Sequence, residues 1–357
     1  MNINTKSLGI IVPAIILTIF SLTSIGSISP QLIQQQAIYI GLGLVAFALF
    51  SLMDYHIYGF FTWSWYAASI ILLLATFIFG DSTRGSIRWI DLGFFRFQPS
   101  EFVKPLLIIF LSVYMARSKT HLKNYFNLLF ASIFPLLLIF LQPDLGTAII
   151  LGVIILSQLF ISKFPKKYIF LTLLPIMLIS PVVFSFLKPY QVQRLQTFID
   201  PKKDPLGSGY NSIQSVIAVG SGKLVGKGLG HGTQSQLNFL PERHTDFIFA
   251  AIAEEFGFVG AIVVILAYLW MLKTILEISE NTKDKTSRLL CVGVFTALSI
   301  QVFVNIGMNM GILPITGITL PLVSVGGSSI ISTAMLLGIV VNASKVYVLP
   351  KASLEIK

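Results

Sequence analysis

The chain has 357 residues, of which 55% are hydrophobic and only 11% are charged, and its formal net charge is +10. Soluble domains carry about 25% charged residues, so this composition excludes an ordinary soluble protein. The single cysteine, Cys291, excludes an intrachain disulfide and any metal site built from cysteines. In a membrane protein the positive charge is explained by Lys and Arg in cytoplasmic loops, so no nucleic-acid partner is expected.

Long apolar runs recur along the whole chain and predict an all-α polytopic membrane protein. A membrane-spanning helix needs about 20 mainly apolar residues, and about ten runs approach that length. In chain order they cover residues 8–25, 35–53, 63–80, 101–117, 125–142, 145–162, 168–187, 247–272, 287–310 and 327–348. Because no linker or internal repeat divides the sequence, we expect residues 1–357 to form a single transmembrane domain.

The basic residues indicate how this domain is oriented. If the N-terminus is cytoplasmic, the short outer turns 26–34, 142–145 and 311–326 contain no Lys or Arg. With an even number of spans, both termini then lie in the cytoplasm. The outer segments 81–100 and 188–246 do carry basic residues, but long loops follow the charge rule poorly. We expect 188–246, between helices 7 and 8, to form a folded external cap, in which "GYNSIQSVIAVGSG" is a short surface helix.

Residues 239–255, "FLPERHTDFIFAAIAEE", gather ionisable groups at the start of the eighth predicted helix. Asp246 could cap that helix, but a cap does not account for the neighbouring Arg243 and His244. Glu254 lies eight residues further on, which is about 12 Å deeper, on the same helical face. A carboxylate at that depth normally faces a cavity or a partner, so we expect this helix to border a polar cavity that opens outward.

Other polar groups are expected near the same opening. Glu101 and Lys104 in "FQPSEFVKP" are one turn apart and can pair, although a plain interfacial salt bridge is the alternative. Asp144 in "QPDLGTA" can cap the sixth helix, and Lys104 is its candidate partner in space. The segment 311–329 is rich in Gly and Pro and cannot face lipid. We expect it to be a broken segment lining the cavity rather than a plain loop. For Glu255 we expect a structural hydrogen bond to a neighbouring helix.

Five segments together resemble the signatures of the SEDS family (shape, elongation, division and sporulation). They are "RWIDLGFFRFQPSEFVK", "QPDLGTA", "FIDPKKDPLGSGYNSIQSVIAVGSGKLVGKG", "FLPERHTDFIFAAIAEE" and "GILPITGITLPLVSVGGSS". They span nearly the whole chain in the family's order, and Arg243 in "PERHTDF" resembles the rod-shape branch more than the cell-division branch. The resemblance implies a ten-helix peptidoglycan glycosyltransferase that polymerises lipid II at the outer face of the bacterial cytoplasmic membrane. It also implies a class B penicillin-binding protein (a transpeptidase) and other elongation-complex membrane proteins as partners, besides membrane lipids.

The same resemblance implies roles for individual residues. The family's catalytic carboxylate maps onto Asp246, the paired residues of its fourth helix onto Glu101 and Lys104, and its external tryptophan onto Trp89. We expect Asp246 to be the general base for an acceptor hydroxyl, and cations to stabilise the departing pyrophosphate. The other candidate substrate-binding residues are Asp144, His244 and, for the pyrophosphate, Arg194, Lys227 and Arg243. A divalent cation, Mg²⁺ or Mn²⁺, is a candidate cofactor.

Two other functions fit the same predicted spans. An outward cavity with buried charges also suits a transporter that flips a lipid-linked precursor across the membrane. The concentration of polar groups at one face and the lack of an evident repeat favour the enzyme over the transporter. The remaining alternative is a scaffold that only positions a cross-linking partner.

Overall fold

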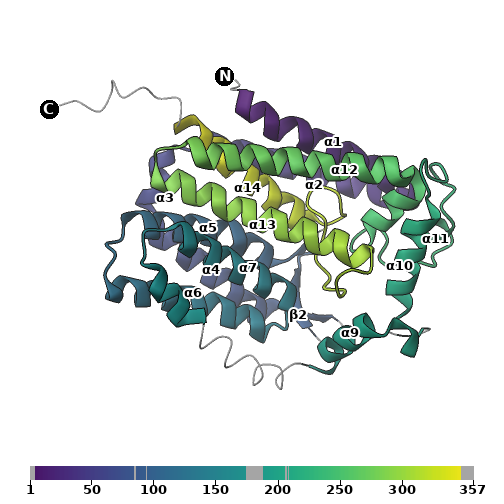
Figure 1. The fold of residues 1–357 in the computed structure, drawn as a ribbon, viewed down its shortest axis with the longest axis horizontal. Helices are drawn as coiled ribbons and strands as arrows, with labels where there is room; N and C mark the ends of the chain where they lie inside the picture. The colour runs from purple at the N-terminus through teal and green to yellow at the C-terminus, as the bar shows by residue number, and fades with distance from the viewer. Residues whose placement is uncertain are drawn as a thin grey trace.

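The computed structural model describes residues 5–83, 86–93, 95–173, 188–205, 207 and 209–346. Long helices lie side by side in one bundle (Figure 1). They are α1 (Thr5–Ile28), α2 (Ile33–Leu52), α4 (Thr62–Phe79), α5 (Pro99–Arg117), α6 (Leu122–Leu141), α7 (Leu145–Ile161), α12 (Ile248–Asn281), α13 (Lys285–Asn309) and α14 (Gly327–Val346). Eight of these described helices are long and apolar enough to cross a membrane, and α7 is a shorter apolar helix. The predicted polytopic α-helical fold is confirmed, while most of the predicted span 168–187 lies outside the described residues.

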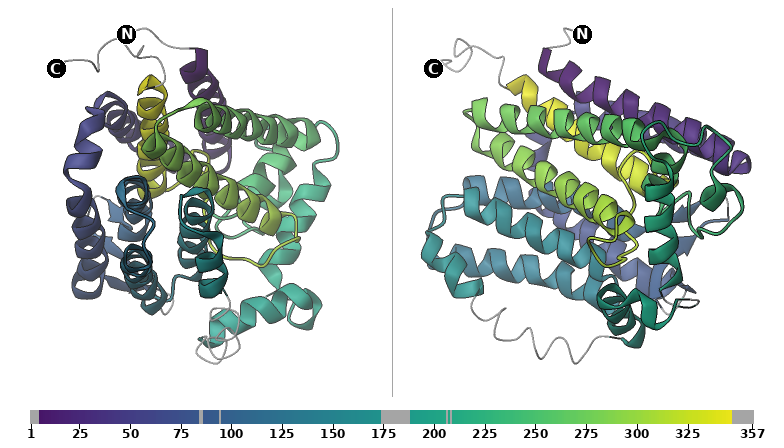
Figure 2. Two further views of the ribbon diagram at one scale, coloured as in Figure 1. Left: turned by 60° about the vertical axis from the view of Figure 1, so that its left-hand side comes forward. Right: turned by 45° about the vertical axis from the view of Figure 1, so that its right-hand side comes forward.

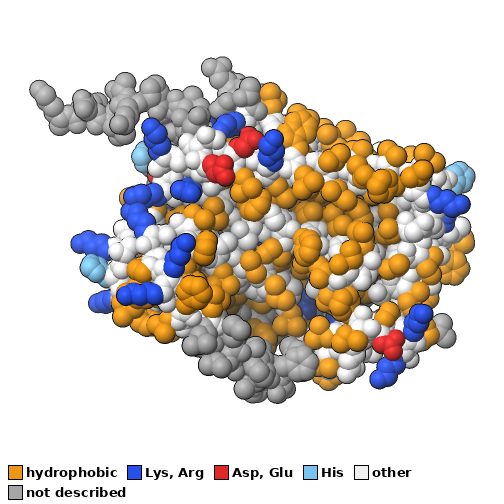
Figure 3. Space-filling view, viewed as in Figure 1, with side chains coloured by type: hydrophobic (Ala, Val, Ile, Leu, Met, Phe, Trp, Pro, Cys, Tyr) orange, Lys and Arg blue, Asp and Glu red, His pale blue; other side chains and the backbone are white. Residues whose placement is uncertain are grey.

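The surface of the bundle matches a membrane environment. Large apolar side chains point outward, and Phe60, Phe130 and Ile78 are 81%, 77% and 74% exposed. Figure 3 shows apolar side chains over the middle of the molecule and many Lys and Arg side chains at one end. That end lies opposite the small helices α10 and α11, and it holds the start of α1 and the end of α14 (Figure 1).

Several small elements were not predicted from the sequence. A one-turn helix η1 (Pro30–Leu32) precedes α2, and a short helix α3 (Tyr55–Phe60) begins after Asp54, whose carboxylate accepts a hydrogen bond from the backbone N–H of His56. An antiparallel sheet contains β1 (Asp81–Thr83), β2 (Ser86–Asp91) and β3 (Arg96–Phe97) in the order β1-β2-β3. β1 and β3 are too short to show an alternating hydrophobic pattern in the sequence, and in the six residues of β2 the alternation is broken where Ile90 follows Trp89.

The predicted external cap contains α9 (Pro189–Ile199), η2 (Pro201–Lys203), α10 (Tyr210–Ser221) and α11 (Thr233–Gln236). The predicted short helix in "GYNSIQSVIAVGSG" is therefore confirmed as α10. It packs against α12 and α13 and runs across the end of the bundle rather than along it (Figure 2). Its buried Ser215 donates a hydrogen bond of 2.8 Å to the backbone oxygen of Asn309 at the end of α13.

Helix α12 is longer than the predicted span 247–272 and is interrupted at Gly257, where φ is 67° and ψ is −164°. The segment after α10 fills this interruption with backbone hydrogen bonds. The N–H groups of Phe258 and Val259 donate to the carbonyls of Lys223 and Leu224 at 2.9 and 3.1 Å. In the opposite direction, the N–H groups of Lys227 and Gly228 donate to the carbonyls of Glu254 and Glu255, both at 3.0 Å. The cap is thus joined to α12 through the main chain.

We predict that Gly257→Ala destabilises the protein strongly. Alanine is strained at this φ and ψ, and its Cβ would lie 2.2 Å from the backbone nitrogen of Gly226. Thermal unfolding of the detergent-solubilised protein measures the effect, which we expect to exceed about 2 kcal/mol. The control is Gly152→Ala in α7, where an added Cβ meets nothing within 4 Å. Equal unfolding temperatures for the two variants would contradict a structural role for the interruption.

Candidate active site around Asp246

The backbone of Asp246 is fixed by two buried amides of α13. The side chains of Asn305 and Asn309 donate to the Asp246 carbonyl at 3.1 and 3.0 Å. Asn309 also accepts a hydrogen bond of 3.0 Å from the N–H of Ala250 in the first turn of α12. Phe247 occupies the N-cap position of α12, so Asp246 does not hold the capping position that was the alternative interpretation of this residue. Asp246 precedes the helix, and its side chain is half-buried.

The segment between α13 and α14 packs beneath Asp246 as irregular backbone. The Ser324 hydroxyl donates to the carbonyl of Thr245 at 2.6 Å, and the N–H of Val325 donates to that of His244 at 2.9 Å. Ile318, Leu320 and Val323 of this segment are buried, and no helix begins before Gly327. The irregular backbone expected here is therefore present, and its part from Ile318 to Val325 is bonded to protein and flanked by buried side chains, as irregular backbone at membrane depth requires.

Gly317 is the point where Asp246 and Arg194 approach each other. Its φ is +76°, and a Cβ built there would lie 3.7 Å from Oδ2 of Asp246 and 3.8 Å from Nη1 of Arg194. Arg194 comes from α9, and its Nη1 donates to the carbonyl of Ile315 at 3.2 Å. The fold thus brings the predicted base and one predicted pyrophosphate-binding cation to the same short stretch of backbone.

A second charged pair lies next to this site. Nη1 of Arg88 lies 3.6 Å from Oδ1 of Asp144, which also caps α7 by accepting from the N–H of Thr147. The Tyr190 hydroxyl donates to the Pro143 carbonyl at 2.8 Å and lies 3.3 Å from Nη2 of Arg88. The pairing expected between Lys104 and Asp144 is wrong, since Arg88 of β2 takes that place. The hairpin that carries Arg88 was not predicted from the sequence, so Arg88 was not expected as the partner of Asp144.

The predicted pair Glu101–Lys104 is present inside the bundle. Nζ of Lys104 lies 2.7 Å from Oε2 of Glu101, and both residues are buried. The Ser100 hydroxyl, one residue before Glu101, donates to Asp144 at 3.4 Å, which links this pair to the Arg88 pair. Trp89 follows Arg88 on β2, is half-buried and stands opposite Asp81 in the strand register.

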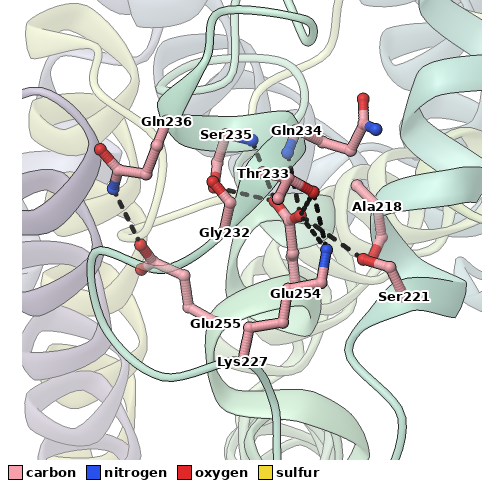
Figure 4. A network of polar contacts seen from close by, with 10 residues as sticks. All are labelled: Ala218, Ser221, Lys227, Gly232, Thr233, Gln234, Ser235, Gln236, Glu254 and Glu255. Carbon is pink, nitrogen blue, oxygen red and sulfur yellow. Dashed lines mark hydrogen bonds and ion pairs between the residues drawn. The ribbon is translucent and has the colours of Figure 1, made fainter.

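The fully buried Glu254 faces the cap rather than a cavity (Figure 4). Its carboxylate accepts hydrogen bonds of 2.9 Å from the N–H groups of Gln234 and Ser235, and it lies 2.9 Å from Nζ of Lys227. The expectation that Glu254 borders an open cavity is therefore wrong. The structural hydrogen bond expected for Glu255 is confirmed, because Ser27 of α1 donates to it at 2.5 Å.

The three candidate cations have different surroundings. Lys227 is engaged by Glu254, with its Nζ also donating to Thr233 at 2.8 Å. Arg243 donates to the side chain of Asn238 and, at 3.2 Å, to the carbonyl of Ile28 at the end of α1. Of the three, Arg194 is the one placed beside Gly317 and Asp246.

Comparison with known proteins agrees with this architecture. The family model described as "Cell cycle protein", which covers FtsW, RodA and SpoVE, matches residues 3–347. The chain belongs to this family, the SEDS family.

The relatives cover most of the SEDS chain. The peptidoglycan glycosyltransferase MrdB of Escherichia coli K12 is 40% identical over 332 residues, which are 91% of this chain and 90% of MrdB. Stage V sporulation protein E of Bacillus subtilis is 34% identical over 87% of this chain and 86% of its own. A chain of a peptidoglycan synthase complex, solved in work on how polymerisation and cross-linking are coordinated, superposes with a TM-score of 0.81 at 29% identity, over 96% of this chain and 98% of its own. The rod shape determining protein RodA of Thermus thermophilus gives a TM-score of 0.72 at 25% identity, with the same coverage.

At Gly317 the site brings together one carboxylate, that of Asp246, and one guanidinium, that of Arg194. Among the residues that the structure describes, no three or more His, Cys, Asp or Glu side chains form a group able to hold a metal ion. Any divalent cation at Asp246 would therefore take most of its ligands from substrate phosphates and water, as Mg²⁺ commonly does.

We predict that Glu254→Gln lowers stability by about 2 kcal/mol or more, because the amide cannot accept all the hydrogen bonds that the carboxylate accepts and leaves Lys227 without its counter-charge. Thermal unfolding measures this loss. The matched control is Glu277→Gln on the same helix, where the carboxylate is 47% exposed and lies 3.8 Å from Lys273. If both variants unfold at the wild-type temperature, the buried pair does not hold the cap.

We also predict a pH dependence from His244. Burial lowers the pKa of His244, the charge of Arg243 lowers it further, and Glu242 opposes the shift. The unfolded chain then binds a proton more readily, so stability is complete above about pH 6.5 and is lost as pH falls below it. His244→Gln should flatten this part of a curve of unfolding temperature against pH. His231→Gln, which changes an exposed histidine of the cap, is the control, and superimposable curves for wild type and His244→Gln would contradict the assignment.

Proposed function

We propose that the protein is a peptidoglycan glycosyltransferase that polymerises lipid II into β-1,4-linked glycan strands, with Asp246 as general base. The observation that carries the proposal is the approach of the Asp246 carboxylate and the Arg194 guanidinium to Gly317. It is supported by 40% identity to a peptidoglycan glycosyltransferase over 91% of the chain.

Asp246 removes the proton from the 4-hydroxyl of the acceptor GlcNAc. That oxygen attacks C1 of the donor MurNAc, and the bond from C1 to the polyprenyl pyrophosphate breaks as the new C1–O4 bond forms. The α-linked donor then gives a β-linked product by inversion. The pyrophosphate leaves with the bonding electron pair, and the fixed positive charge of Arg194 stabilises it. Because pyrophosphate is a weakly basic leaving group, this scheme needs one carboxylate and no general acid.

The surrounding residues support these two groups. Asn305 and Asn309 hold the backbone of Asp246, so the base enters the reaction already positioned. Tyr190, whose ring centroid lies 5.8 Å from the Arg194 guanidinium carbon, connects Arg194 to the Arg88–Asp144 pair. In the proposal, the Glu101–Lys104 pair shapes the wall behind Asp144, while Trp89 and His244 border the bound sugars.

The membrane setting follows from the distribution of charge. The end of the bundle opposite the cap carries many Lys and Arg side chains (Figures 1 and 3), which favours cytoplasmic termini and an external site in the cytoplasmic membrane. We propose a class B penicillin-binding protein as partner, by analogy with the related synthase complex, with other elongation proteins alongside. A divalent cation bound mainly by substrate phosphates would neutralise part of the leaving group's charge.

We predict that Asp246→Asn reduces polymerisation of labelled lipid II by about 10³-fold or more, and that Arg194→Gln reduces it by about 10²-fold. Both are measured on folded protein in detergent with its partner, with and without EDTA. Glu277→Gln and Arg96→Gln are matched controls, since these side chains are 47% and 68% exposed and lie outside the proposed site. Wild-type rates for Asp246→Asn would refute the base role. If the unmodified protein forms no polymer in detergent, where no membrane must be crossed, both the flippase and the scaffold alternatives are favoured.

A further inference from the structure

Arg194 also lines a cleft that has no part in the proposed chemistry. The cleft has a volume of about 200 Å³ and is bounded by α9, α10 and residues 313–315 of the broken segment. Pockets for drug-sized ligands have volumes of about 300–1,000 Å³, so this cleft has room for a single small ring rather than for a folded peptide. Arg194 lines this cleft, and its Nη1 would lie 3.8 Å from a Cβ built on Gly317, which in turn would lie 3.7 Å from Oδ2 of Asp246.

Three of the polar side chains that line this cleft have no partner among the described residues. Gln193 of α9 and Asn211 and Ser212 of α10 all face it. Within the described ranges, the side chains of these three residues make no hydrogen bond, ion pair or ring contact with other protein groups. In contrast, the nearby Ser215 is buried and bonded to Asn309. Two amides and a hydroxyl are thus left to bond to water or to a ligand.

The chemistry of the lining is that of a site for a neutral polyol. Amide and hydroxyl groups both donate and accept hydrogen bonds, and sugar hydroxyls do the same. The rings of Tyr190 and Phe198 also line the cleft, and aromatic rings offer apolar faces that can cover the C–H groups of a sugar. A polyprenyl chain would leave the amides unsatisfied. The carboxylates of a stem peptide would need more cations than Arg194 alone.

We propose that this cleft binds a sugar ring of the glycan chain, next to the ring that reacts at Asp246. This inference rests on the proposed function, because it places the bound sugar in line with Arg194 and the reacting centre. The strand then lies between α9 and α10, with its pyrophosphate-linked end at Arg194. Two sources share this chemistry: the strand already made, and the disaccharide of incoming lipid II.

The first test measures binding without catalysis. Soluble, lipid-free GlcNAc–MurNAc tetrasaccharide is titrated into the full-length Asp246→Asn protein in complex with its partner, and the Kd is determined. Adding Gln193→Ala and Asn211→Ala should weaken binding about 3- to 30-fold, as expected for the loss of two hydrogen bonds. The matched control is Gln196→Ala, which removes an exposed glutamine from α9 outside the cleft. Because this background lacks the base, binding is read independently of whether Asp246 acts as proposed.

The second test distinguishes the two sources in otherwise unmodified protein. If the cleft holds the strand already made, the double variant produces shorter glycans while its KM for lipid II stays at the wild-type value. If the cleft holds the incoming disaccharide, KM rises 3- to 30-fold and kcat changes little. The proposal is overturned if the folded double variant matches Gln196→Ala in tetrasaccharide binding, product length and KM. A protein that binds the tetrasaccharide but forms no polymer would instead count against the proposed activity alone.

Discussion

Within hydrocarbon, every backbone N–H and C=O group must find a partner in the protein, and the unusual parts of this structure follow from that constraint. Helix α12 is interrupted at Gly257, yet the freed donors and acceptors are taken up by residues 223–228 of the cap. The segment before α14 has no regular secondary structure, but its backbone is paired. Asn305 of α13 donates to the carbonyl of Ile318, and the N–H of Leu320 donates to the hydroxyl of Ser324 within the segment. Both departures from the helix lie near the end of the bundle that contains Asp246. The cost of leaving polar groups unpaired therefore determines where this membrane protein can carry an irregular, site-forming backbone.

Charged side chains obey the same restriction. Lys104 is fully buried but paired with Glu101, and Asp144 is paired with Arg88. Glu254 is satisfied by Lys227 and two backbone N–H groups of the cap. These ion pairs are fixed parts of the structure around Asp246, because breaking a buried ion pair costs a large part of the stability of the fold. Asp246 and Arg194 differ in being partly or largely exposed, which is what contact with a large, charged substrate requires.

Much of this organisation could be predicted from the sequence, because long apolar runs have one stable solution in a bilayer. The α-helical bundle, the helix in residues 210–221 and the irregular segment before α14 could be predicted from the length and pattern of apolar runs and from the Gly and Pro content. The partners of individual charges could not be predicted in the same way. Lys104 was expected to pair with Asp144, whereas Arg88 does so from a strand of six residues. Glu254 was expected to border a cavity because its hydrogen-bond donors, the N–H groups of Gln234 and Ser235, come from a different segment of the chain. The sequence gives no sign that this segment packs against Glu254. Asn305 and Asn309, which position Asp246, carry no local pattern that distinguishes them from other polar residues in a membrane helix.

The backbone bonds between the cap and α12 also limit how the protein can move during turnover. A lid that swings open would have to break four main-chain hydrogen bonds around Gly257 and the buried contacts of Glu254 at the same time. Residues 222–236 of the cap are therefore expected to stay in place during turnover rather than to open and close over the site. In the proposed function, a lipid-anchored substrate would then enter sideways from the bilayer, and the growing polymer would leave past α9, a cap helix that takes part in none of these bonds.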